Sequence, residues 1–228
     1  MVPFNAAMTG RGAVITTTVW LPYNTSLYAI VGQLGTCNGL NLACNSNSVM
    51  SGAGGGTFVL LANGSALLAA GGGCGFYASG VTNPASCDAS LNSTSGNDGF
   101  TCDGHSNSPG GVAGGAGGGY CYQGAGLFAN STFSSVSGAD VGNTPSLSPL
   151  YGGNGSYSGD GSTSDRNGGF GGGGLSGGGG GYSGGGGSLS ISCWYGGGGG
   201  SFCAQGISNC VTNRYNSAAG YVTISLVA

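Results

Sequence analysis

Apolar runs with a two-residue alternation lie near both ends of the chain and flank a long glycine-dominated middle. Residues 13–21 (AVITTTVWL) and 27–33 (LYAIVGQ) are rich in β-branched and aromatic residues, which favour strands. Two shorter apolar runs follow at 57–61 and 66–70. The Asn63-Gly64 pair between them is typical of a tight hairpin turn, because both residues tolerate positive φ. The first part of the chain therefore predicts strands, two of them joined as a hairpin.

The last nine residues predict a closing strand over 220–228. Val222, Ile224 and Leu226 alternate there with polar residues, so they would lie on one face. No stretch of the chain shows the spacing of an amphipathic helix. The pattern thus divides the chain into a strand part (1–70), a glycine-rich insertion with loops (71–219) and the closing strand.

Glycine is densest in residues 168–200, and the chain holds 56 glycines in 228 residues. Such a tract is either a flexible linker or a fold built from the backbone itself. An ordered fold is favoured, because 39% of residues are hydrophobic and nine are cysteines. Aromatic residues also flank the glycine runs: Phe76, Tyr77, Tyr120, Tyr122, Phe170, Tyr182, Trp194, Tyr195 and Phe202. These aromatics are predicted to cover the edges of the glycine-rich part, with glycan stacking as the alternative.

Glycine can form an extended helix of three residues per turn without side chains on any face. Several such helices can pack side by side through N–H···O bonds between them, which satisfies the backbone without α-helix. Collagen is excluded, because it needs a strict Gly-X-Y repeat and abundant proline, and the chain has six prolines. The sequence therefore predicts an all-β fold in which sandwich strands bracket an inserted bundle of polyglycine helices.

Charge is nearly absent. Three Lys+Arg and six Asp+Glu give a net charge of −3, and only 4% of residues are charged. Nucleic acid is not expected as a partner, since phosphate binding needs clustered basic residues. No apolar run approaches the roughly 20 residues that cross a bilayer. Residues 1–8 lack the basic start and apolar run of a secretory signal, so a processed or partial chain is expected.

Nine cysteines in a chain with so few charges indicate an oxidising compartment. The spacing suggests two local disulfides, Cys37 with Cys44 and Cys203 with Cys210. The pairing of the others stays open: Cys74, Cys87, Cys102, Cys121 and Cys193. The odd count leaves one thiol free or paired outside the chain. No C-x-x-C occurs, so no metal site is expected.

Five N-glycosylation sequons point to the same compartment. Their acceptors are Asn24, Asn63, Asn92, Asn130 and Asn154. Covalent glycans would supply the solubility that charges usually give. The expected location is extracellular, at the cell surface.

Motifs that resemble catalytic sites have simpler explanations. Ser176 and Ser183 match the G-x-S-x-G nucleophile pattern, but their flanks are polyglycine. His105, the one histidine, follows Cys102 and Asp103 in a polar loop and is interpreted as a surface residue. Asp98 and other aspartates near glycine fit turns better than a calcium loop. No catalytic residue and no cofactor is predicted.

Four ordered segments resemble a known family. They are LYAIVGQLG from Leu27, GGTFVL with LLAAGGG between Gly54 and Gly73, RNGGFGGGG from Arg166, and GYVTI from Gly220. In this order they are similar to the glycine-rich extracellular domain of anaplastic lymphoma kinase and leukocyte tyrosine kinase. The resemblance runs from about residue 12 to the end and implies a bundle of polyglycine helices inserted into a sandwich of tumour-necrosis-factor-like type. The family's opening strands and its kinase and membrane parts have no counterpart here, so receptor activity is not carried over.

A sandwich without its opening strands exposes an unpaired edge, which a neighbouring chain could complete by strand addition. We therefore expect a non-enzymatic extracellular glycoprotein module, structural or adhesive, that serves as a subunit of a filamentous or cell-surface assembly. Its expected partners are copies of itself or another surface protein. The alternative is a ligand-binding ectodomain fragment of a receptor-like protein, and a secreted enzyme is the least favoured reading.

Overall fold

The computed structural model describes residues 10–36, 50–77, 85–101, 107–119, 122–132, 144–157, 167–175, 177–187 and 194–226. Within them the regular elements are short strands and two single turns of 3₁₀-helix, so the all-β class predicted from the sequence is confirmed. The strands are β1 (Gly12–Thr18), β2 (Leu27–Ile30), β3 (Met50–Ser51), β4 (Thr57–Leu61), β5 (Ala66–Ala70), β6 (Phe76–Tyr77), β7 (Gly99–Thr101), β8 (Asn107–Ser108), β9 (Trp194–Tyr195), β10 (Phe202–Cys203) and β11 (Ser208–Asn216). The 3₁₀ turns are η1 (Ala85–Cys87) and η2 (Pro149–Tyr151).

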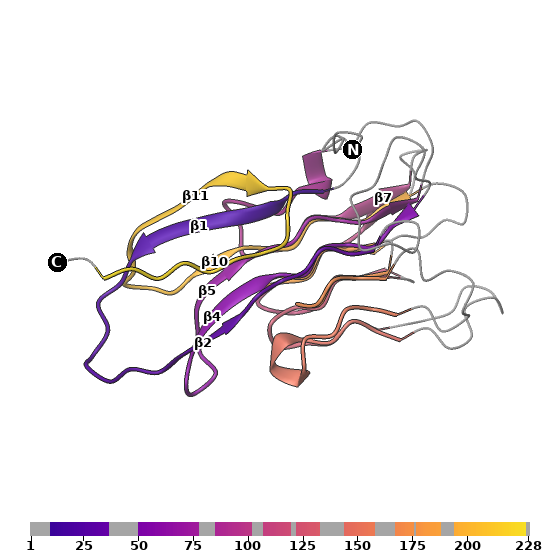
Figure 1. Ribbon diagram of the computed structural model, residues 1–228. Coiled ribbons are helices and arrows are strands. Elements are labelled where there is room, and N and C mark those ends of the chain that lie inside the picture. Colours follow the sequence, from indigo (N-terminus) through magenta and orange to yellow (C-terminus); the bar gives the residue numbers. More distant parts are fainter. Residues whose placement is uncertain are drawn as a thin grey trace, which may run out of the picture.

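A four-stranded antiparallel sheet, in the order β10-β5-β4-β2, occupies one half of the molecule (Figure 1). The predicted hairpin is confirmed, since β4 and β5 pair across a turn in which Gly64 has φ 82°. Side chains alternate along both strands between buried and half-buried positions. The buried face packs Phe58, Leu60 and Ala69 against Leu127, a residue of the glycine-rich part. This sheet thus has one covered face and one face that is only half covered.

A separate two-stranded antiparallel sheet is formed by β1 and β11. β1 lies next to β5, and the backbone of Ala13 bonds Gly71 just after β5. The disulfide between Cys203 and Cys210 joins β10 of the first sheet to β11 of the second. The two sheets are therefore held together covalently at this end.

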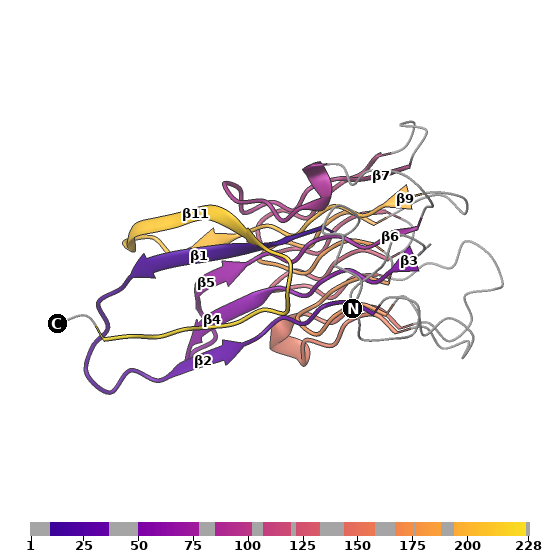
Figure 2. The same ribbon diagram turned by 45° about the horizontal axis from the view of Figure 1, so that its top comes forward.

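The opposite end of the molecule carries the very short strands of a third sheet, in the order β3-β6-β9-β7-β8 (Figure 2). A small core there contains Cys74, Phe76, Cys87 and Tyr195, with Phe100 packed against it. The ring of Tyr195 lies 6.3 Å from that of Phe76 and 5.7 Å from that of Phe100. Disulfide and aromatic packing together close this end.

Between the two ends, glycine-rich segments run lengthwise side by side and are bonded to one another rather than within themselves (Figures 1 and 2). The segment 177–181 shows the pattern. The N–H groups of Gly178 and Gly181 donate to the segment that holds Tyr122 and Ala125, whereas those of the two residues between them donate to two other segments. The hydrogen-bond direction therefore repeats every third residue.

The same three-residue repeat occurs in segment 196–200. Gly196 and Gly199 both donate to segment 72–75, while Gly197 and Gly200 both donate to segment 183–186. Each segment thus contacts several neighbours around its axis. Its backbone N–H and C=O groups are hydrogen-bonded to these neighbours and do not form the two-stranded ladder of a β-sheet.

These segments lie too close for side chains. A Cβ on Gly179 would sit 2.2 Å from the carbonyl oxygen of Gly72, and one on Gly199 would sit 2.1 Å from that of Gly180. The flexible-linker interpretation of residues 168–200 is therefore wrong for their described parts, and glycine is present there because backbones touch.

The strand predicted at 220–228 is not formed over the described residues 220–226, and the last strand is β11 instead. Gly220 donates one hydrogen bond to Gly32, but no strand pairing follows it. Alternation alone predicted a strand there, although a strand also needs a partner along its length. Two predicted strands are also shorter than expected: β1 ends at Thr18 rather than Leu21, and β2 ends at Ile30 rather than Gln33.

Candidate functional site

An exposed apolar surface lies at the end of the molecule that carries β1 and β2. The loop after β1 and the C-terminal stretch reach this same end in both views (Figures 1 and 2). The large exposed side chains there are Trp20 (92%), Tyr23 (95%), Tyr28 (59%), Tyr221 (60%), Ile224 (67%) and Leu226 (101%). No residue of 12–36 or 217–226 is charged. We call these six side chains the apolar end surface, and their exposure and the lack of charge are typical of a contact surface.

Sheet edges are open next to this surface. β2 is an edge strand of the four-stranded sheet. It pairs with β4 on one side, and no strand of the described residues pairs with it on the other. Val59 of β4 and Leu68 of β5 are half-buried on the face opposite the covered core. Within the part of the chain that the structure describes, the sheet of β1 and β11 contains these two strands. If further strands paired with β1, they would extend its sheet over Val59 and Leu68 and bury this face of β4 and β5 more completely.

A narrow groove starts at the inner end of these strands. Its walls are backbone-rich and include Gly12 and Ala13 of β1, Gly54 and Gly55, and the stretch Asn216–Gly220. Ser51 also lines it, and the buried Ser51 hydroxyl has no hydrogen-bond partner among the described residues. An extended backbone fits such a groove better than a bulky ligand does, since few side chains project into it.

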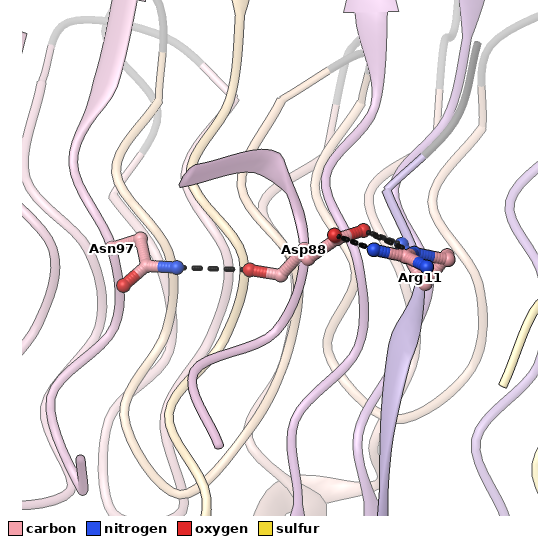
Figure 3. Close-up of polar contacts among 3 residues, drawn as sticks. All are labelled: Arg11, Asp88 and Asn97. Atoms are coloured by element: carbon pink, nitrogen blue, oxygen red, sulfur yellow. Dashed lines mark hydrogen bonds and ion pairs between the residues drawn. The ribbon is translucent and has the colours of Figure 1, made fainter. Parts of the chain in front are cut away.

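One ion pair ties β1 to the glycine-rich part (Figure 3). The Arg11 guanidinium donates to both carboxylate oxygens of Asp88, at 3.0 Å from Nε and 2.5 Å from the terminal nitrogen. The backbone N–H of Arg11 donates to the same carboxylate, while the Asp88 carbonyl accepts from Asn97. The guanidinium also lies 4.2 Å from the ring centre of Tyr215 on β11. Hydrogen bonding to Asp88 raises the pKa of Arg11, so the guanidinium stays charged.

We expect the change Arg11→Ala to lower the free energy of unfolding by about 1–2 kcal/mol, because the nearly buried Asp88 loses two charge-assisted bonds but keeps the backbone one. The Arg11 side chain is 42% exposed, which places the effect at the lower end of the range for such pairs. Urea denaturation followed by fluorescence measures it. Arg214→Ala, an exposed arginine on β11, is the matched control, and an equal loss in both variants would contradict a specific role for the ion pair.

The disulfide prediction for Cys203 with Cys210 is confirmed. A second disulfide joins Cys74 to Cys87, two of the cysteines whose pairing the sequence left open. The remaining cysteines lie outside the described residues: Cys37, Cys44, Cys102, Cys121 and Cys193. The predicted pair of Cys37 with Cys44 therefore stays a prediction.

All five sequon asparagines lie in the described part and are exposed, as glycan attachment requires: Asn24, Asn63, Asn92, Asn130 and Asn154. Asn24 sits in a tight turn with φ 63°, and Asn63 sits in the β4–β5 turn. Their glycosylation remains a prediction.

Of the residues that sequence analysis tested for catalytic or calcium-binding roles, Ser183 and Asp98 lie in the described part of the chain. Ser183 is fully buried and its hydroxyl accepts from the Gly114 N–H, so it contributes to packing. Asp98 accepts from the Gly110 N–H at 2.9 Å, so its carboxylate links the residue before β7 to a residue that follows β8. His105 and Ser176 lie outside the described residues. Among the residues that are described, no three His, Cys, Asp or Glu side chains gather as a metal site would need.

Sequence reasoning missed two features. Arg11 and Asp88 are 77 residues apart, and no sequence signal connects them. β11 is polar on both faces and lacks the alternation that marks a strand.

The flanking aromatics were predicted to cover the glycine-rich part. Phe76, Tyr122 and Tyr195 are buried, whereas Tyr182 and Phe202 are only partly buried.

No protein-family model matches the chain, and no curated protein matches it. Within the described residues, no helix has the length and apolar character needed to cross a membrane.

Proposed function

We propose that the chain is a non-enzymatic, structural subunit of an extracellular glycoprotein assembly, in which a neighbouring copy adds an extended segment beside β1. The observation that carries this proposal is the incomplete covering of β4 and β5 together with the edge of β1 that no strand of the described residues pairs with. A protein partner is favoured because an extended backbone is the ligand that an open sheet edge binds.

The architecture underlying this function is a β-sandwich that brackets polyglycine helices. The two layers of the sandwich are the four-stranded sheet and the β1–β11 sheet, in the tumour-necrosis-factor-like manner that the family resemblance implies. The three-residue hydrogen-bond repeat of segments 177–181 and 196–200 supports extended helices of three residues per turn. Such a bundle would be a stiff, nearly chargeless spacer behind an adhesive end.

The chemistry of the end surface fits a subunit contact. A charged partner would find no complementary charge in residues 12–36 and 217–226. Trp20 and Tyr23 are of the residue type that dominates binding energy in interfaces. A head-to-tail contact of this kind need not close into a ring, and it then gives filaments.

Two disulfides and five exposed sequons support an extracellular location. The alternative function, a ligand-binding ectodomain fragment, would use the same exposed aromatic residues for a different protein. Self-association distinguishes the two, because a receptor fragment would bind its ligand without forming polymers of its own.

We expect the protein to self-associate, and the pair of changes Ile224→Asp and Leu226→Asp to weaken association by roughly tenfold or more. Both side chains are exposed in the monomer, so its stability should change little. Light scattering coupled to size-exclusion chromatography, with electron microscopy of the particles, measures the effect.

The matched control is Val112→Asp, which places a charge at an equally exposed aliphatic residue (65%) in a loop of the glycine-rich part. A protein that stays monomeric up to its solubility limit, with no extended segment bound, would overturn the assembly proposal. Equal weakening by the control would show that the effect is only one of net charge.

A further inference from the structure

An aromatic hollow lies beside the β4–β5 turn. It has a volume of about 520 Å³ and is lined by the turn residues 63–66 together with Phe128, Leu150, Tyr182 and Phe202. The rings of Tyr182 and Phe202 stack with centres 4.3 Å apart, and Phe128 meets Tyr182 edge-on at 6.1 Å. Phe128 is 52% exposed and Leu150 of η2 is 43% exposed. The hollow is therefore an apolar, ring-lined surface open to solvent.

One wall of this hollow is a glycosylation sequon. Asn63 is exposed at its rim, and Gly64 lies close to Leu150 on the other side. The Asn63 side-chain oxygen accepts the Ser65 N–H at 3.0 Å, which holds the side chain in the turn. Its amide nitrogen, the atom that carries a glycan, makes no hydrogen bond within the described structure. The attachment atom is thus held at the edge of an aromatic surface and left available.

We propose that a glycan on Asn63 folds back over this hollow, with its first sugar rings stacked on Phe128, Tyr182 and Phe202. A pyranose ring has an apolar C–H face and a polar hydroxyl rim, so it can cover aromatic rings while its hydroxyls stay in water. Covalent attachment at the rim gives the sugar a high effective concentration at the hollow. The glycan would then act as a part of the folded core of this end.

This inference rests on the proposed extracellular glycoprotein function, and the experiment separates the two. The full chain is secreted from eukaryotic cells as wild type, Ser65→Ala, Ser65→Thr and Ser26→Ala. Ser65→Ala removes the Asn63 sequon but keeps Asn63 itself and the turn, while Ser65→Thr retains the sequon. Ser26→Ala removes the Asn24 sequon at another exposed serine, and Asn24 does not line the hollow. Glycopeptide mass spectrometry assigns occupancy, and thermal unfolding gives Tm.

We expect occupancy at Asn63 and a Tm lower by roughly 2–6 °C in Ser65→Ala, with little change in Ser65→Thr and Ser26→Ala. In a Phe128→Ala background, Ser65→Ala should lower Tm by less, because the stacking surface is already reduced. Binding of an apolar dye should rise when the glycan is lost.

Glycans at other sequons with Asn63 unoccupied would overturn this inference and leave the proposed function intact. Glycans at no sequon would overturn both. Occupancy at Asn63 with equal Tm changes in Ser65→Ala and Ser26→Ala would show that the sugar does not use the hollow.

Discussion

Replacing Gly179 by alanine should lower the free energy of unfolding by about 3 kcal/mol or more. The added Cβ would lie 2.2 Å from the carbonyl oxygen of Gly72. That oxygen already accepts the N–H of Gly199, so it cannot move away without breaking a bond. The two segments would have to separate by about 1 Å to reach an ordinary C–H···O distance.

Gly54→Ala is the matched control, because Gly54 belongs to the same network but its Cβ would find its nearest neighbour at 3.5 Å. Gly54 donates to Gly73 and accepts from Gly180, so its backbone is as fully bonded as that of Gly179. For Gly54→Ala we expect the free energy of unfolding to change by no more than about 1 kcal/mol. The change would be stabilising if the lower conformational entropy of the unfolded chain dominates. Thermal unfolding of the two variants makes the comparison, and equal losses would contradict close backbone packing as the reason for glycine.

The strands that sequence reasoning predicted well are those whose neighbours are local. β4 and β5 have alternating apolar residues and an Asn-Gly turn between them, so pattern and turn chemistry agree. β11 could not be found in this way, because its stability comes from pairing with β1 about 200 residues earlier in the chain. Residues 220–226 are the opposite case. Their apolar and polar residues alternate as in a strand, but no described strand pairs with them.

The candidate surface was only partly accessible to sequence reasoning. Sequence reasoning predicted an open sheet edge, but nothing in residues 12–36 indicated that Trp20 and Tyr23 would be almost fully exposed. Glycine content predicted a backbone-built bundle, yet the neighbours of each segment come from residues far apart in the chain, as Gly178 with Tyr122 and Gly179 with Gly197 show. Polyglycine carries no side-chain code for such a choice, so disulfides and the flanking aromatics must help to set which segments meet.

The disulfide between Cys74 and Cys87 is the strongest such constraint at the far end. Both residues are buried, with Phe76 and Tyr195 packed around them, and the Cys74 N–H donates to the Cys87 carbonyl. The double change Cys74→Ala and Cys87→Ala should lower the free energy of unfolding by about 3 kcal/mol. The disulfide closes a loop with a sequence separation of 13, and its loss also leaves space in a small core. Tm should fall by roughly 6–12 °C for a chain of this size.

The pair Cys203 and Cys210 provides the comparison, since it closes a shorter loop of sequence separation 7 and both residues are half-buried. Its double alanine variant should lose about 2 kcal/mol. In the native wild-type protein, a mild reductant should open this half-buried disulfide first and leave the fully buried one intact. Mass mapping of alkylated peptides can follow this even if a variant does not fold. If Cys74 and Cys87 were alkylated first, or if their removal cost less than that of Cys203 and Cys210, the far end would not depend on a buried covalent link. The aromatic cluster around Tyr195 would then have to hold the glycine segments in register alone.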